Sequence, residues 1–435
     1  MTASPATPSD HGLRTAFPAT LLIALAALAA VAPLATDAYL PAFAQMADDL
    51  GVSASSVQLT MTTFLVGIAL GQLGIGVLSD RVGRRPLVLW GSVLALAASV
   101  GAALAPGLAL LLIARFFQGL GGAAGMVLGR ALISDRSRGI TAARALSVVM
   151  AIQGIAPVAA PILGGVLVEP IGWRGILGVV AAFTGLLVVM VVLWVPESLP
   201  AERRHDGGLR MLLDGTRELA RDHVLVRLLF INALSFGLLM AYLSAAPFVL
   251  RNVLGMGTVA YTAVFGLCGA TVTVTIAVAA SLVRRFSQAR QVRVGLIAGL
   301  VVDTVFAGVC LMWLREPVTG PERMPLLVAV VALFLAHVAC LGLSMGNAPA
   351  LALDRTGRWA GTGSALLGFL QFVVGGLVSP LVGLTGEASG VAFGVVIVAV
   401  GAVANILAVF GLRERGEKQR LAAQVTECRQ QRLGQ

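Results

Sequence analysis

The sequence predicts an all-α membrane protein whose twelve transmembrane helices form two six-helix bundles. Of its 435 residues, 58% are hydrophobic and only 12% are charged, whereas soluble domains carry roughly 25% charged residues. Apolar runs of about 20 residues, which can cross the hydrocarbon core of a bilayer as helices, follow one another along the chain. A polar segment divides these runs into two sets of six, so the composition and the pattern both exclude a water-soluble fold.

The first expected helix begins close to the N-terminus. Met1 to Ala16 are polar and carry little positive charge. The apolar run from Phe17 to Thr36 is longer than the core of a signal peptide, which has about 7 to 15 residues. We therefore expect this run to remain attached as the first transmembrane helix.

Charged and Pro- or Gly-rich breaks delimit the helices that follow. The expected helices lie near residues 17–40, 54–78, 86–105, 108–130, 143–168, 174–195, 228–250, 258–282, 293–314, 325–347, 360–384 and 389–411. This pattern predicts an N-terminal bundle over 1–195, a cytoplasmic linker over 196–227, a C-terminal bundle over 228–412 and a cytoplasmic tail over 413–435. Two equal bundles joined by a polar linker are typical of transporters built from a duplicated helical module.

The basic residues indicate the orientation of the chain. Of the 31 basic residues, 26 fall in the termini and in alternate loops, Arg115 lies within a helix, and the opposite loops hold only Arg174, Arg251, Arg315 and Arg323. Cytoplasmic loops are enriched in basic residues, so we expect a multi-pass inner-membrane protein with both termini in the cytoplasm. The net charge of +10 forms no compact patch with interleaved aromatic residues, so we do not expect it to bind nucleic acid.

Several functional classes lack their motifs. The cysteines are Cys268, Cys310 and Cys340 within apolar runs and Cys428 in the tail, with no C-x-x-C spacing and no histidine at ligand spacing. Core packing is the expected role of the first three, and no disulfide or metal site is predicted. H-E-x-x-H, G-x-S-x-G and P-loop motifs are absent as well. We therefore expect neither an enzyme nor a cofactor, and no use of ATP by this chain.

The most specific motif is the stretch from Gly76 to Pro86, GVLSDRVGRRP, between the second and third expected helices. It resembles the signature loop of the major facilitator superfamily, G-x-L-S/A-D-R-x-G-R-R/K, at every position. The resemblance implies a gating loop in which Asp80 faces the helix start near Ala360 and Gly361, where the helix dipole favours an anion. The loop residues assigned to gating are Gly76, Asp80, Arg81, Gly83, Arg84 and Arg85. A plain positive-inside turn, the alternative, explains only the arginines.

A second motif surrounds Arg115 in the fourth expected helix. The stretch RFFQGLGGA from Arg115 to Ala123 is similar to the R-x-x-Q-G-x-G-x-A motif of the same superfamily. A guanidinium does not deprotonate in a protein, and a charge at membrane depth needs a cavity or a partner. Arg115 is therefore a candidate regulator of a nearby proton site. The alternative is that its side chain extends to the outer surface.

A third motif places an acid at the outer end of the first helix. The stretch TDAYLPA contains Asp37, Tyr39 and Pro41 and resembles the D-x-Y-L-P-A stretch of the Bcr/CflA branch of drug/proton antiporters. Removal from water favours the neutral form of a carboxyl group, so Asp37 is a candidate for binding and releasing a proton. Some relatives carry a further acid two turns earlier, where this chain has Ala29, so one proton per cycle is expected. The alternative is that Asp37 lies in the outer headgroup region.

The fifth expected helix is rich in proline and glycine. Its residues Gly154, Pro157, Pro161, Gly164 and Gly165 resemble the antiporter motif that ends in G-P-x-x-G-G, with Ala160 where glycine is usual. Proline bends a helix and small residues let helices pack closely. The resemblance favours an exporter, and a kinked packing helix is the alternative.

Other polar residues within the apolar runs are candidates to line a substrate cavity. They are Tyr39, Gln153, Asn232, Tyr242 and Gln371. Asp303 and His337 are ionisable and match no motif. A neutral packing role is favoured for His337 over a proton relay, whereas an acid at the depth of Asp303 needs a cavity, a partner or a proton.

These resemblances imply proton-coupled efflux of small amphiphilic drugs by alternating access. The expected cavity is apolar with few charges, which suits such compounds. Phenicol-like antibiotics are the first expectation, and a broad multidrug range or a single self-made antibiotic is the alternative. A carrier of the same fold that imports or uniports a metabolite is the second hypothesis. The expected partners are a small-molecule substrate, protons and the lipid bilayer, and the protein is expected to be a monomer.

Overall fold

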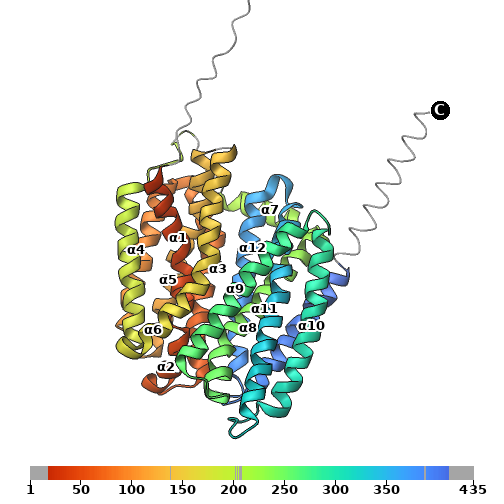
Figure 1. The fold of residues 1–435 in the computed structure, drawn as a ribbon. Helices are drawn as coiled ribbons and strands as arrows, with labels where there is room; N and C mark the ends of the chain where they lie inside the picture. Colours follow the sequence, from red (N-terminus) through yellow and green to blue (C-terminus); the bar gives the residue numbers. More distant parts are fainter. Residues whose placement is uncertain are drawn as a thin grey trace, which may run out of the picture.

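The computed structural model describes residues 18–137, 139–200, 202, 204, 208–386 and 388–410. Every regular element in these ranges is a helix (Figure 1). Eleven segments of the described chain are long and apolar enough to cross a membrane. Large apolar side chains such as Trp90, Val166 and Leu193 are more than 60% exposed, as expected of surfaces that face lipid.

The helices before the polar linker follow the expected order. They are α1 (Ala19–Asp37), η1 (Leu40–Ala42), α2 (Phe43–Leu50), α3 (Ala54–Val82), α4 (Arg84–Ala103), α5 (Leu108–Arg136) and α6 (Gly139–Trp194). The first span is longer than expected, because α1, η1 and α2 together run from Ala19 to Leu50. We call residues 19–194 the first half.

The 56-residue element α6 covers two of the expected helices. A continuous helix of this length would extend about 84 Å, far more than a bilayer requires. Gly172 interrupts it with φ 63° and ψ −178°, at the expected break between residues 168 and 174. Within α6, the stretch that qualifies as a membrane span is Ala159–Trp194.

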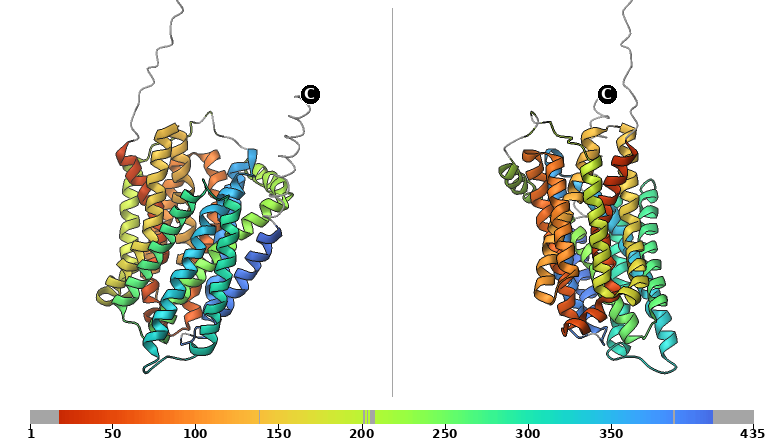
Figure 2. Two further views of the ribbon diagram at one scale, coloured as in Figure 1. Left: turned by 45° about the vertical axis from the view of Figure 1, so that its right-hand side comes forward. Right: turned by 90° about the vertical axis from the view of Figure 1, so that its left-hand side faces the viewer.

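The linker contains a helix that the sequence pattern did not predict. This helix, α7 (Gly208–Ala220), contacts α3 of the first half and α8 and α12 beyond the linker; Figure 2 shows it at one end of the molecule. The next helix begins at His223, earlier than the expected residue 228. Asp222 explains the earlier start, because its carboxylate accepts hydrogen bonds from the N–H groups of Val224 and Leu225 and caps the helix.

The helices after the linker form what we call the second half, residues 223–410. They are α8 (His223–Pro247), η3 (Phe248–Val253), α9 (Thr258–Leu282), α10 (Gln288–Trp313), α11 (Arg323–Leu353), η4 (Gly357–Trp359), α12 (Ala360–Val378), η5 (Ser379–Gly383) and a final helix over Val391–Phe410. Figure 1 shows the helices of the first half on one side of the molecule and α8 to α12 on the other. The main helix contacts between the halves join α3 to α12 and α6 to α9.

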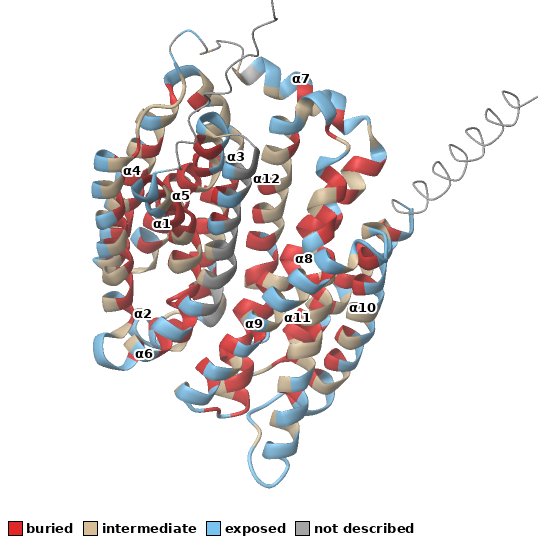
Figure 3. Cartoon of the chain, turned by 45° about the horizontal axis from the view of Figure 1, so that its top comes forward, coloured by how far each residue is buried: buried red, intermediate tan, exposed pale blue. Residues whose placement is uncertain are grey.

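The buried apolar residues lie on the faces that the helices turn toward one another (Figure 3), and they form three clusters. The largest contains residues of both halves, among them Tyr39, Met46, Tyr242 and Leu250, at the end of the molecule opposite the signature loop. The other two lie toward the signature-loop end, and each belongs to one half, apart from Leu219 of the linker. The two halves therefore share a core at one end only.

Candidate functional site

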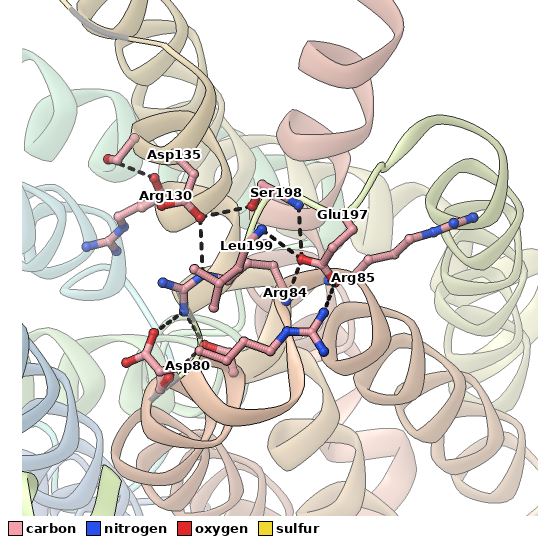
Figure 4. A network of polar contacts seen from close by, with 12 residues as sticks. Asp80, Arg84, Arg85, Arg130, Asp135, Glu197, Ser198 and Leu199 are labelled. Carbon is pink, nitrogen blue, oxygen red and sulfur yellow. Dashed lines mark hydrogen bonds and ion pairs between the residues drawn. The ribbon is translucent and has the colours of Figure 1, made fainter. Parts of the chain in front are cut away.

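The signature loop forms a tight turn between α3 and α4. Gly83 has φ 111°, a conformation that side chains with a Cβ rarely adopt. Arg84 pairs with Asp80 at 2.7 Å and with Asp135 of α5 at 3.2 Å, and it hydrogen-bonds the hydroxyl of Ser79. Arg85 donates to the carbonyl oxygen of Val192 at 3.0 Å. The arginines thus join the loop to α5 and α6 (Figure 4).

An acid outside the motif completes this turn. Glu197, which follows α6, accepts hydrogen bonds from the backbone N–H groups of Arg84 at 3.0 Å and Arg85 at 3.3 Å, the first residues of α4. Partial burial raises the pKa of Glu197, but the N–H groups of Leu199, Arg84, Ser198 and Arg85 outweigh it and hold the pKa below its ordinary value. The sequence analysis missed this role. The signal for it is an acid directly after the proline that ends an apolar run.

A cavity of about 330 Å³ lies between the halves at the signature-loop end. Its walls come mainly from α3, α5, α7 and α12. They combine apolar side chains such as Val77, Met126, Met211 and Ala365 with three arginines, Arg84, Arg130 and Arg358. Asp80 and Gly361 line the same cavity, and no hydrogen bond or ion pair between them is seen in the described part of the chain. The latch expected between Asp80 and the start of this helix is therefore not formed in this conformation.

Four of the five expected substrate residues, Tyr39, Asn232, Tyr242 and Gln371, are not among the described residues that line this cavity. Asn232 of α8 donates to the side-chain oxygen of Gln371 on α12 at 3.1 Å. Tyr39 and Tyr242 are 1% and 3% exposed and belong to the core that both halves share. The side chain of Gln153 lies outside the described residues.

The opposite end of the interface between the halves is closed by direct contacts. Arg251 donates to the carbonyl oxygen of Pro41 at 2.7 Å. The side-chain amide of Gln58 donates to the carbonyl oxygen of Ser244 at 3.3 Å, and Thr62 donates to Gly376 at 2.8 Å. With the shared core, these bonds close this end while the signature-loop end holds the cavity.

Asp37, the last residue of α1, lies within this closed region. Its side chain is buried, with an exposure of 4%. Its charge acts on the hydroxyls of Tyr242 in α8 and Tyr261 in α9, so the carboxyl group faces the second half. Both hydroxyls are buried; that of Tyr242 lies beside the thiol of Cys268, and that of Tyr261 has no hydrogen-bond partner among the described residues. The chain has three tyrosines, and the third, Tyr39, follows Asp37 by two residues.

Arg115 of α5 is fully buried beside the end of α1. Its guanidinium donates to the carbonyl oxygen of Ala35 at 2.9 Å and to Gln118 at 2.7 Å. It lies over the ring of Tyr39, 4.0 Å from the centroid, which adds a cation–π attraction. The side chain does not reach the outer surface, because none of it is exposed.

The glycine pair of the fifth expected helix lies beside the same site. A Cβ at Gly164 would collide with the carbonyl oxygen of Ala38, next to Asp37. A Cβ at Gly165 would collide with Thr262 of α9. This part of α6 therefore packs against both halves, and Pro161 lies one turn earlier. Gly154 and the side chain of Pro157 lie outside what the structure describes.

A second pair of ionisable residues lies within the second half. Nδ1 of His337 and Oδ1 of Asp303 are 2.5 Å apart, and both side chains are 1% exposed. The described residues contain no group of three or more His, Cys, Asp or Glu side chains arranged to hold a metal ion.

Comparison with known proteins agrees with the signature loop. The family model described as "Major Facilitator Superfamily" matches residues 25–380. The chain is 33% identical to the "Uncharacterized MFS-type transporter YdgK" of Bacillus subtilis, over 90% of this chain and 95% of the relative. It is 29% identical to a "Bicyclomycin resistance protein homolog" of Haemophilus influenzae, over 83% of this chain and 88% of the relative. It is 26% identical to the "Multidrug resistance protein MdtL" of Vibrio parahaemolyticus, over 79% of this chain and 84% of the relative.

Proposed function

Because the chain belongs to the major facilitator superfamily and is therefore a multi-pass membrane transporter and not an enzyme, we propose that it exports small amphiphilic drugs in exchange for protons. Two relatives carry drug-resistance names, which supports efflux over uptake. Phenicol-like antibiotics are the first substrates to test. Import or uniport of a metabolite by the same fold is the competing hypothesis.

The proposed topology follows the sequence pattern. Twelve spans form two six-helix bundles, divided at residues 195 and 228, with α6 supplying two of the spans. The signature loop, the linker and both termini face the cytoplasm, and the protein acts as a monomer in the inner membrane. In this orientation the cavity opens inward, where an exporter collects its substrate. The walls of this cavity combine apolar side chains with a few charged ones, which suits an amphiphilic molecule.

The observation that carries the proposal is the position of Asp37. This acid is buried where α1 meets the second half, close to the buried hydroxyls of Tyr242 and Tyr261. A buried carboxylate without a full set of partners is costly, so binding a proton stabilises the closed outer end. When the halves separate at that end, Asp37 meets water and exchanges its proton.

Arg115 and the cavity provide the remaining steps. Arg115 holds the end of α1 through Ala35, and its guanidinium stays charged throughout the cycle. Substrate enters the inward cavity, the halves rock, and substrate leaves outside as a proton binds Asp37. Return of the protonated carrier brings the proton inward, and Asp37 releases it to the cytoplasmic side before the next substrate is carried out. Alternating access then couples the two movements.

A drug-susceptibility panel in an efflux-deficient bacterial host tests the proposal. Cells that express the wild type should resist at least one amphiphilic compound, and Asp37→Asn should abolish that resistance. Asp48→Asn is the matched control, since Asp48 is an exposed acid in the same span, and it should behave like the wild type. A protonophore should collapse export.

Two results would decide against the proposal. Equal resistance from the wild type and Asp37→Asn would reject Asp37 as the coupling acid. Resistance to none of the compounds, from a protein that is correctly inserted, would favour the metabolite carrier.

A further inference from the structure

The buried pair of Asp303 and His337 lies apart from the residues assigned to proton coupling. Asp303 is in α10 and His337 is in α11, and their contact joins the two helices. Burying a charged or polar pair within a membrane-spanning bundle costs free energy, so such a pair is a candidate functional site. Nothing in the cycle above uses these residues.

The charge of this pair depends on one proton. With a neutral imidazole and an ionised carboxyl group, the pair carries a net charge of −1. With one more proton it is neutral as a whole. The pair is faced by the thiol of Cys340 on α11, by Leu238 on α8 and by Gly401 on the final helix, and none of the described residues that line its cavity is cationic. The bound proton therefore takes the place of a counter-ion.

The second ring nitrogen of His337 carries the exchangeable proton. Nδ1 faces Asp303, whereas Nε2 is buried on the side of the ring where the backbone carbonyl of Leu238 lies close enough to interact with its proton. A cavity of about 10 Å³ adjoins the ring and is lined also by Gly295 and Ser344. This is about the space that one water molecule occupies.

Buried polar groups continue from this cavity toward the signature-loop end. Ser344 lies two turns after His337 on α11, and Asn347 lies one turn further on. Asn347 donates to the side-chain oxygen of Gln291 on α10 at 3.2 Å, and Gln291 donates to the carbonyl oxygen of Phe286 at 3.2 Å. Phe286 lies in the loop between α9 and α10, so these groups connect the pair with the proposed cytoplasmic surface.

The pair is also packed against the surroundings of Asp37. Phe334, three residues before His337, packs edge-on against Tyr242 with ring centroids 5.3 Å apart. Leu238, which lines the cavity of the pair, lies one turn before Tyr242 on α8. The hydroxyl of Tyr242 in turn interacts electrostatically with Asp37.

We propose that Asp303 and His337 form a second proton-binding site, which exchanges one proton with the cytoplasmic side through Nε2 of His337. On release, the Nε2–H bond breaks and the proton passes to water. The imidazole becomes neutral and still donates Nδ1–H to the Asp303 carboxylate, so the charge of the pair changes from 0 to −1. The proposal implies that two protons move per transport cycle, one bound in each half. Only this implication rests on the proposed export.

The four histidines of the chain allow a direct test. His11→Gln, His205→Gln and His223→Gln together leave His337 as the sole histidine, and its ring nitrogens can be followed by ¹⁵N nuclear magnetic resonance in the purified protein. Because histidine titrates near neutral pH, the ring should gain and lose one proton reversibly between about pH 5 and 9. Asp303→Asn in the same background should move this transition to lower pH, because the imidazolium loses its carboxylate partner.

A ring that keeps one protonation state throughout, or a transition that Asp303→Asn leaves in place, would overturn the proposal and assign the pair a structural role. The titration of the intact pair decides the matter even if Asp303→Asn does not fold. No substrate is needed, so failure of the export proposal would not affect this result. Where a drug is exported, Asp303→Asn should in addition alter the pH dependence of its transport, whereas a purely structural loss would lower transport equally at every pH.

Discussion

Arg115 and Asp37 are opposite charges in the same buried region, yet their partners differ. The arginine is held by hydrogen bonds and by two aromatic rings, and it keeps its charge at any physiological pH. The acid lies near the hydroxyls of Tyr242 and Tyr261, and the Tyr261 hydroxyl has no hydrogen-bond partner among the described residues. At the residue scale, therefore, Asp37 is suited to change its protonation while Arg115 stays constant.

Arg115→Lys should impair transport even though it keeps the charge. A lysine ammonium cannot reproduce the fixed fork that reaches both Ala35 and Gln118. The loss of charged hydrogen bonds of about 1.5–3 kcal/mol should reduce export by about tenfold or more. Transport in membrane vesicles measures this, with Arg174→Lys at a partly exposed position as the control. Unchanged export by Arg115→Lys would contradict the positioning role.

Tyr261→Phe should stabilise this conformation and slow transport. The hydroxyl is buried without a hydrogen-bond partner in the described ranges of the chain, so its removal should raise the free energy of unfolding by about 1 kcal/mol. Thermal unfolding of purified protein in detergent measures the change. Tyr39→Phe is the control and should lower the free energy of unfolding, because it removes the hydrogen bond between the Tyr39 hydroxyl and Thr60 at 3.0 Å. A Tyr261→Phe variant less stable than the wild type would show that the hydroxyl has a partner.

Glu197→Gln should lower the free energy of unfolding at pH 7 by about 1 kcal/mol, the size of a lost helix cap. The pKa of Glu197 lies below its ordinary value, which is about 4.3. Its contribution is therefore fully present above that value and is lost as the pH falls through the lowered pKa. Thermal unfolding should separate variant and wild type at pH 7 and bring them together in acid.

Glu322→Gln provides the comparison for Glu197, because Glu322 precedes α11 without making a side-chain cap. It should unfold like the wild type at both pH values. A difference between Glu197→Gln and the wild type that stayed constant into strong acid would mean that the carboxylate charge contributes nothing.

At the scale of elements, close approach of helices depends on residues without side chains. The segment of α6 around Gly164 touches the backbone at the end of α1, and the neighbouring Gly165 touches α9. In a membrane such small residues allow the packing contacts that hold helices together. This packing brings α6 beside Asp37 and joins the two halves.

Gly164→Ala should destabilise the protein by about 1–3 kcal/mol, the cost of overpacking a close contact, because its Cβ would collide with the Ala38 carbonyl oxygen. Gly178→Ala is the matched control on the same helix, since nothing lies within 4 Å of a Cβ there. That control should be neutral or gain about 0.5–1 kcal/mol from helix propensity. Equal effects of the two substitutions on thermal unfolding would refute the close packing.

At the scale of the whole molecule, the two halves share a core at one end and enclose a cavity at the other. The hydrogen bonds between Arg251 and Pro41, and between Gln58 and Ser244, lie at the closed end. An alternating-access carrier must break contacts of this kind when it opens outward. The conformation described here therefore corresponds to the inward-open state of the proposed cycle.

Thiol accessibility tests this state in a background without the four native cysteines. Ser364 lines the cavity, so the Ser364→Cys thiol should react with a membrane-impermeant reagent in inside-out vesicles. Ser244→Cys is fully buried at the closed end and should react at least about tenfold more slowly from either side, because the closed core excludes water. Rapid labelling of Ser244→Cys in right-side-out cells would show that the resting carrier opens outward.

The sequence by itself determined the membrane environment, the positions of most helices and the superfamily, because hydrophobicity and local motifs act over short stretches of chain. Its signature loop was enough to predict a turn that needs Gly83 and arginines that join neighbouring helices. It also identified Arg115 and Asp37, since a charge within an apolar run is conspicuous without any structure.

Only the tertiary structure decided which side chains meet. Tyr242 and Tyr261 come together with Asp37 from three helices, and Asp303 meets His337 across 34 residues of chain. Helical periodicity gives the faces of one helix but not the rotation of its neighbours, so Tyr39 was expected in a cavity and lies in the core. Contacts between distant residues depend on how whole helices pack, and no local pattern records that packing.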